Sequence, residues 1–427
     1  MSEHDGVTLC SIRWSEVCPW LSILRSFRLA VTLRLLVYGA SGILLTLLGW
    51  WCIDGVVWSG GFWASDFQNA TPWMVIDGAV RTPPAPPLLS EPVVELGQPR
   101  STWQTSGPML GTWTQLSRPI WRIFVEKEMT ATALLGCILS ALWSLAVWAF
   151  FGGAITRIAA VQLASEEQVG WGESLRWAAS KWLSYFGAPL FPLMGIALAV
   201  LPLLVAGLLM RWPPTLLLVG LVWPLALVGG LVMAILLVGL IFGWPLMWAT
   251  ISVEGTDTFD ALSRTYAYVF QRPLRYLFYV LVAAVLGLLG WLVVENFAGA
   301  VIWLAEWGTS WGSGVQGWTS LELDGAGGAG VAVMRFWAGW IKWLALGYFY
   351  SYFWTASTVI YYLLRRDVDA TEMDEVFLEA DESEKQFNLP PLATDAAGAP
   401  TVADAPAAGE AAAKPQAEGP AQPQAEG

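Results

Sequence analysis

The sequence predicts an all-α integral membrane protein with six transmembrane helices, two amphipathic interfacial helices on the cytoplasmic side and a disordered C-terminal tail. Of its 427 residues, 56% are hydrophobic and only 13% charged, whereas a soluble domain carries about 25% charged residues. Several apolar runs reach the length of about 20 residues that a helix needs to cross the hydrocarbon core. Many of the 28 tryptophans lie beside the ends of these runs, where indole rings favour the headgroup layer.

The formal charge of −12 is confined to the end of the chain. From Asp367 onward there are fourteen acids and two lysines, a difference of −12. The preceding part is therefore neutral, with no basic surface for nucleic acid. The acidic stretch and the Ala/Pro-rich sequence after it predict a disordered cytoplasmic tail over residues 367–427.

Residues 1–32 contain several arginines amid apolar residues, which predicts a cytoplasmic N-terminal segment with an interfacial helix. The membrane domain then covers residues 33–366. Its outer loops are expected at 54–129, which is rich in glycine, proline and tryptophan, and at 299–336. The six spans are expected at about residues 33–53, 130–153, 188–210, 218–243, 277–298 and 337–362.

The apolar run from 215 to 251 allows two interpretations, one kinked span or a hairpin. As one helix its 37 residues would be about 55 Å long, nearly twice the hydrocarbon thickness of about 30 Å. Pro224 and Pro245 permit either form. A hairpin would place Arg264 and Arg272 outside the cell, against the positive-inside tendency. We therefore expect one span.

Two segments, 165–195 and 252–280, have the pattern of helices that lie in the membrane interface. In the second, Asp257 is placed to cap the helix. Aligning residues 173–175 with 260–262 gives an offset of 87 residues, which predicts a parallel repeat of span, surface helix and span. The interfacial residues singled out are Trp171, Leu175, Trp182, Asp257, Phe259, Leu262 and Phe270.

Two ionisable residues, Glu295 and Lys342, fall within expected spans near the outer edge of the hydrocarbon. Charges at that depth are costly and usually pair, reach the interface or face water. The pair could form an intramembrane ion pair, or each side chain could extend to the headgroups by itself. The sequence leaves both readings open.

The chain offers no catalytic or ligand-binding constellation. Its only histidine is His4, and its four cysteines lack metal-site spacing. No P-loop, dinucleotide fingerprint or HExxH motif occurs. We therefore expect a protein without intrinsic catalysis, cofactor or metal.

The step SVEG at 252–255, followed by FDALSRTYAYVFQ, resembles a bacterial integral-membrane family. This is the family around the membrane domain attached to some glycerophosphoryl diester phosphodiesterases, with its uncharacterised relatives. The resemblance covers about residues 140–300. It implies a multi-span helical domain that accompanies lipid-related or envelope functions, and without the phosphodiesterase domain it implies no hydrolase activity. The matching residues are Val253, Glu254, Gly255, Ala261, Leu262 and Thr265.

These observations predict a multi-pass protein of the cytoplasmic (inner) membrane with both termini in the cytoplasm. Its expected role is a membrane-embedded binding or organising subunit, in contact with the lipid bilayer and with lipid or a membrane or envelope protein as its partner. The alternative is a small transporter or permease with a cavity between the two repeats. A polar, water-accessible cavity would favour the transporter, and a lipid-filled groove would favour the binding subunit.

Overall fold

The computed structural model describes residues 18–57, 107–126, 129–165, 168–320, 326–377, 392–394 and 400–402. The chain divides into two units, Met1–Val376 and Phe377–Gly427. In the second unit, β1 (Leu392–Thr394) and β2 (Pro400–Val402) form an antiparallel pair with Leu392 opposite Val402. Of the tail predicted to be disordered, the structure describes residues 367–377 and these two strands. The other residues of the tail lie outside the described residues.

Five described helices are long and apolar enough to cross a membrane, which supports the predicted class of protein. They include the four helices α3 (Leu33–Val57), α7 (Ala131–Ala164), α9 (Trp182–Leu209) and α12 (Pro273–Ser320). The fifth is α10 (Leu216–Glu254), which follows the short turn η3 (Pro213–Thr215).

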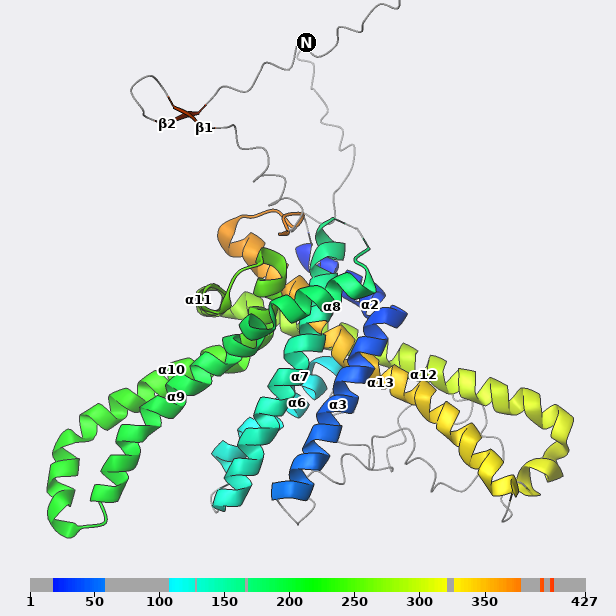
Figure 1. Ribbon diagram of the computed structural model, residues 1–427, viewed down its shortest axis with the longest axis horizontal. Helices are drawn as coiled ribbons and strands as arrows, with labels where there is room; N and C mark the ends of the chain where they lie inside the picture. The colour runs from blue at the N-terminus through cyan, green and yellow to red at the C-terminus, as the bar shows by residue number, and fades with distance from the viewer. Residues whose placement is uncertain are drawn as a thin grey trace, which may run out of the picture. The chain divides into compact units, whose positions relative to one another are not determined.

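The expected sixth span lies in α13 (Ala326–Asp369), which is long but not as apolar as these five. The reason is its composition, because tyrosine, tryptophan, serine and threonine alternate through its second half. Every residue from Gly347 to Leu364 is nevertheless buried. Helix α13 packs against α2, α3, α6, α7, α10 and α12 (Figure 1). Since its neighbours surround it, the helix does not need a lipid-compatible surface.

The outer loop predicted over 299–336 is wrong for most of its length, because α12 continues to Ser320 and α13 begins at Ala326. The outer loop predicted over 54–129 is wrong for its last part, which forms the helix α6 (Gly107–Val125). This helix packs against α7, α12 and α13. The Thr112 hydroxyl donates a hydrogen bond to the Phe349 carbonyl at 3.2 Å, and the Trp113 indole donates to the Ile241 carbonyl at 3.0 Å. Composition suggested a loop because glycine, proline and tryptophan are frequent here, whereas neighbouring helices supply the packing that stabilises a helix.

The apolar run 215–251 forms one continuous helix, as expected, rather than a hairpin. Helix α10 has 39 residues and is therefore about 58 Å long. Both Pro224 and Pro245 lie inside it. It ends at Gly255, whose left-handed φ of 66° is a conformation that glycine adopts without steric cost. Away from that end, α10 pairs mainly with α9 and exposes apolar side chains.

Three short helices precede long ones. The turn η1 (Pro19–Ser22) leads into α2 (Ile23–Ala30), which packs on α13 before α3 begins. Helix α8 (Trp171–Ser180) precedes α9, and α11 (Thr258–Gln271) precedes α12. The N-cap residues of α8 and α11 are Gly170 and Asp257. Their positions are 87 residues apart, the offset predicted for the repeat.

Helices α3 and α13 are in backbone contact at two glycines. A Cβ added at Gly39 would lie 2.3 Å from the Gly347 carbonyl oxygen, and one added at Gly347 would lie 2.3 Å from the Leu36 carbonyl oxygen. Backbone atoms cannot yield as a flexible side chain can. We therefore predict that Gly39→Ala or Gly347→Ala lowers the free energy of unfolding by about 1–3 kcal/mol.

The measurement is equilibrium unfolding of the purified protein in mixed detergent micelles. Gly220→Ala is the matched control, because it lies inside α10 with nothing within 4 Å of an added Cβ. That variant should be neutral or slightly stabilising. Equal stability of all three variants would contradict the close contact.

Candidate functional site

The C-terminal end of α10 carries a buried carboxylate. Glu254 is the last residue of the helix, and its side chain is only 8% exposed. The left-handed glycine that follows turns the chain into α11, so both α11 and the end of α13 lie close to this carboxylate. A buried charge is costly unless it is paired and hydrogen-bonded.

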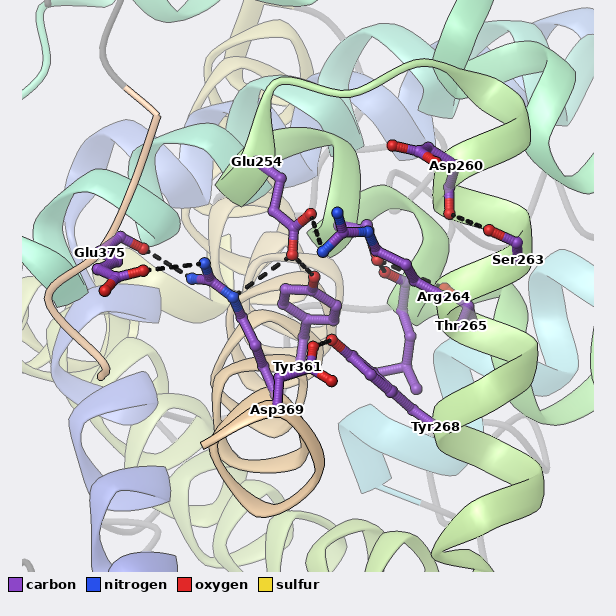
Figure 2. A network of polar contacts seen from close by, with 12 residues as sticks. Glu254, Asp260, Ser263, Arg264, Thr265, Tyr268, Tyr361, Asp369 and Glu375 are labelled. Carbon is purple, nitrogen blue, oxygen red and sulfur yellow. Dashed lines mark hydrogen bonds and ion pairs between the residues drawn. The ribbon is translucent and has the colours of Figure 1, made fainter. Parts of the chain in front are cut away.

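Three groups compensate the Glu254 carboxylate (Figure 2). Its Oε2 lies 2.7 Å from an Arg264 nitrogen on α11, and its Oε1 lies 3.4 Å from Arg365 Nε on α13. The Tyr361 hydroxyl, also on α13, donates a hydrogen bond to Oε1. Arg365 is 13% exposed and Arg264 is 41% exposed. The ion pair with Arg365 is thus the more shielded of the two.

The start of the predicted tail belongs to this network, which corrects the boundary placed at residue 367. The Tyr268 hydroxyl on α11 donates to Asp369, the last residue of α13 (Figure 2). Arg365 donates to the Glu375 carbonyl at 2.9 Å. Asp367 pairs with Arg275 at 3.1 Å and accepts a hydrogen bond from a tyrosine on α12. Acidic residues that composition assigns to a tail therefore fix the ends of three helices.

Burial, followed by the hydrogen bond and charge of Asp369, raises the pKa of Tyr268 above its ordinary value. Because the pKa of Tyr268 is raised in the folded state, its contact with Asp369 contributes fully to the free energy of unfolding below the ordinary tyrosine pKa of about 10. The contribution is lost as the pH rises through the raised value. The contact is therefore intact at physiological pH.

A second set of contacts holds the same end of α10 from the opposite side. The Ser252 hydroxyl lies 2.6 Å from the Thr156 hydroxyl and 2.7 Å from the Tyr185 hydroxyl. Arg157 donates to the Ser252 carbonyl at 2.8 Å, and Lys181 donates to the Gly255 carbonyl at 2.6 Å. These residues come from α7, α9 and the turn between α8 and α9, so the end of α10 is bound by both of those long helices.

An apolar pocket lies between α6, α7, α9 and α10. Its empty volume is about 870 Å³, a figure that includes the open space at its mouth. Tryptophans line it together with aliphatic side chains. Representative lining residues are Trp113, Leu116, Ala141, Trp148, Leu193, Leu240, Trp244 and Trp248.

Most polar groups in the pocket wall already have partners within the protein. The Trp113 indole donates to the Ile241 carbonyl, and the Trp248 indole donates to the Tyr185 carbonyl at 2.8 Å. The Ser144 hydroxyl donates to the Ser140 carbonyl at 2.8 Å. The wall therefore offers little to an ion or a sugar and is suited to hydrocarbon. Among the described residues, no group of three or more His, Cys, Asp or Glu could hold a metal.

The predicted apolar faces of α8 and α11 do not point into the protein. Phe259 is 62% exposed, Trp171 and Phe270 are exposed, and Leu175 and Leu262 are half-buried. The buried positions are five small or hydroxyl-bearing residues together with Trp177, Tyr268 and Val269. They are Ser174, Trp177 and Ala178 in α8, and Thr258, Ala261, Thr265, Tyr268 and Val269 in α11. Small side chains allow the helix backbone to approach the bundle.

The remaining predicted residues on these helices are placed as follows. Asp257 caps α11 as expected, because its Oδ1 accepts from the Asp260 amide at 3.1 Å. Trp182 does not belong to α8 but opens α9. Its indole donates to the Ala146 carbonyl at 3.0 Å, so it contacts α7 rather than a free interface.

Glu295 lies half-buried on α12, and Lys342 lies exposed on the neighbouring helix α13. The charge of Lys342 acts on Glu306, also on α12. Glu306 is 11 residues beyond Glu295 along the sequence, which is about 16 Å along a helix. The pairing of Glu295 with Lys342 stays a prediction.

The residues on which the family resemblance rests lie in the network at the end of α10. Glu254 is its central carboxylate, Gly255 ends the helix, and both Ala261 and Thr265 are fully buried in α11. Sequence reasoning missed Arg365 and Tyr361 as partners of Glu254. No sequence signal links α10 with α13, which supplies both residues.

Comparison with known proteins returns no match, since no family model, no curated protein and no solved structure is similar to this chain.

The Glu254 network yields a stability prediction. We expect Glu254→Gln to lower the free energy of unfolding by about 2–3 kcal/mol, because Arg365 loses a shielded counter-charge. This decrease in the free energy of unfolding is smaller than the decrease expected for a wholly buried ion pair, because Arg264 is partly exposed and solvent screens its charge.

Glu126→Gln is the matched control, because Glu126 forms an exposed pair with Arg122 at 2.7 Å. It should change the free energy of unfolding by at most about 0.5 kcal/mol. Thermal unfolding in detergent measures both variants. A Glu254→Gln variant as stable as Glu126→Gln would show that the network does not hold the helix ends.

Proposed function

We propose that this protein is a non-catalytic, multi-pass protein of the cytoplasmic membrane that binds lipid through its acyl chain. The observation that carries this proposal is the apolar pocket between α6, α7, α9 and α10. Its lining of tryptophan and aliphatic side chains suits a hydrocarbon chain, and several of its polar wall groups are hydrogen-bonded within the protein itself. A pocket of this kind binds apolar matter by shape and dispersion rather than by charge.

The proposed topology has six spans, with α13 as the sixth, and both termini in the cytoplasm. The basic residues of the network at the end of α10, Arg264, Arg275 and Arg365, would then face the cytoplasm, in keeping with the positive-inside tendency. The burial of α13 among other helices accounts for its lower hydropathy. The turn at η3 would lie on the outer side.

The proposed parallel repeat consists of α7, α8 and α9 followed by α10, α11 and α12. Its support is the order of the elements and the pair of N-caps 87 residues apart. Two further pairs with the same spacing are buried in both copies: Ser174 with Ala261, and Ala178 with Thr265. In this arrangement the exposed Phe259, Phe270 and Trp171 would dip into the lipid interface.

The family resemblance adds a lipid-related or envelope role, and with it a membrane or envelope protein as partner. The acidic tail would be a cytoplasmic docking segment for that partner. Because Asp367, Asp369 and Glu375 take part in the fold, a tail deletion that tests docking should begin after Phe377. Loss of a co-purifying partner would support docking, and an unchanged set of partners would contradict it.

A transporter is the second candidate, and the character of the pocket argues against it. A permease for a polar solute needs a polar, water-accessible path near the middle of the membrane. The pocket described between α6 and α10 is lined by tryptophan and leucine instead.

The pocket yields a binding prediction. Ala141→Trp places an indole ring inside the pocket, so we expect the lipid retained by the purified protein to fall about tenfold, a loss of about 1.4 kcal/mol in binding. Native mass spectrometry of the gently extracted protein measures retained lipid. Gly207→Trp is the control, since an added Cβ at Gly207 meets nothing within 4 Å. Equal retention by both variants would contradict binding in the pocket.

The topology yields a labelling prediction. In a cysteine-free background, Ser263→Cys on the exposed side of α11 should not react with a membrane-impermeant thiol reagent added to intact cells. Trp212→Cys in the exposed turn before η3 should react. Labelling of Ser263→Cys from outside would reverse the proposed orientation.

A further inference from the structure

The outward face of helix α2 carries two arginines that have no counter-charge. Arg25 and Arg28 are exposed, and neither forms an ion pair or a side-chain hydrogen bond with another described residue. Residues three apart on a helix are neighbours, with Cβ atoms about 5–6 Å apart. Two guanidinium groups so placed can reach the same anion, and their planar forks suit a phosphate.

The opposite face of α2 fixes the helix to the bundle. Ile23 and Ala30 are fully buried there. The Ser351 hydroxyl of α13 donates to the Ala30 carbonyl at 2.9 Å. A Cβ added at Gly290 of α12 would lie 2.7 Å from the Phe27 ring. Because packing sets the position of the helix, the two arginines on its other face project from a fixed platform.

The positive charge of α2 differs from that of other arginines at the same end of the long helices (Figure 1). Arg264 and Arg365 both pair with Glu254. Residues 18–53, by contrast, contain no aspartate or glutamate. The charge of α2 therefore has no neutralising carboxylate among the described residues.

Large apolar side chains flank the two arginines. Leu24 is 49% exposed and lies four residues before Arg28, while Val31 is also exposed and lies three residues after it. Both spacings place side chains on one face of a helix. Leu33, at the start of α3, is 62% exposed. A soluble anion would leave these apolar groups in water, whereas a phospholipid offers a charged headgroup and acyl chains together.

We propose that the outward face of α2, defined by Leu24, Arg25, Arg28 and Val31, binds the headgroup of an anionic phospholipid. The guanidinium groups bind the phosphate and the net negative charge of the headgroup. The two apolar side chains enter the acyl layer beside it. None of the described residues that line the apolar pocket belongs to α2. This site therefore goes beyond the proposed function, because it selects a lipid by the charge of its headgroup.

The experiment compares two phospholipids with the same dioleoyl chains, the anionic phosphatidylglycerol and the zwitterionic phosphatidylcholine. Native mass spectrometry of the full-length protein, titrated with each lipid in detergent, gives the dissociation constants. We expect phosphatidylglycerol to bind about 25-fold more tightly, because each arginine near an anionic headgroup strengthens binding about fivefold. Arg25→Gln/Arg28→Gln should reduce that preference to about fivefold or less. Its binding of phosphatidylcholine should not change, which also shows that the variant is folded.

Arg211→Gln/Arg272→Gln is the matched control. Both residues are exposed arginines without an ion pair among the described residues. They lie apart from each other, in the turn before η3 and at the end of α11. This variant removes the same charge without removing a neighbouring pair, so it should keep the preference for phosphatidylglycerol. An equal loss in both double variants would show that net charge decides the preference and would overturn the assignment to α2.

Further outcomes separate this site from the apolar pocket. Ala141→Trp fills the pocket and should keep the preference for phosphatidylglycerol. Loss of the preference in Ala141→Trp would place the anionic lipid in the pocket and overturn the site on α2. If the native protein binds both phospholipids equally well, the site on α2 is overturned while binding of acyl chains in the pocket stands.

The acidic segment of this chain after Phe377 is the other candidate occupant of α2. A protein truncated after Phe377 should bind phosphatidylglycerol as the full-length protein does. A gain of about tenfold in affinity on truncation would show that the acidic segment occupies α2. That result would overturn the assignment to a phospholipid.

Discussion

The pairing of Glu254 with Arg264 and Arg365 is the interaction on which the rest of this arrangement depends. A carboxylate at the end of a long apolar helix is costly to bury unless cations reach it. Two helices far apart in the sequence, α11 and α13, provide them. On the other side of α10, Arg157 and Lys181 bind backbone carbonyls of the same turn. Apolar contacts are not directional, so they do not fix how far one helix is shifted along another. The polar contacts at the end of α10 fix that position.

The central place of α13 follows from contacts that its neighbours make with its small and aromatic residues. Gly347 lets α3 approach in backbone contact, and Tyr350 stacks on Trp148 of α7. The tryptophans Trp244, Trp248 and Trp354 pack together where α10 meets α13. Trp244 and Trp248 also line the apolar pocket, so side chains that hold the bundle together also shape the proposed binding site.

The proposed binding of an acyl chain has one physical basis. Helices α9 and α10 are anchored at the end near Glu254 and expose apolar side chains towards their connecting turn. The pocket forms where α9 and α10 face α6 and α7. Walls of tryptophan and aliphatic side chains favour a hydrocarbon chain. Ion pairs therefore hold the helix ends, whereas apolar side chains form the proposed binding site.

The sequence by itself determined the membrane class, the single helix over 215–251 and the Asp257 cap, because these depend on hydropathy, length and local hydrogen bonding. The residues on which the family resemblance rests include Glu254 but not its partners Arg264 and Arg365. Only the tertiary structure decided that α6 is a helix, that Ala261 and Thr265 rather than Phe259 face the bundle, and that Asp369 belongs to the fold. Each of these depends on contacts with helices far away in the chain, which no local pattern records.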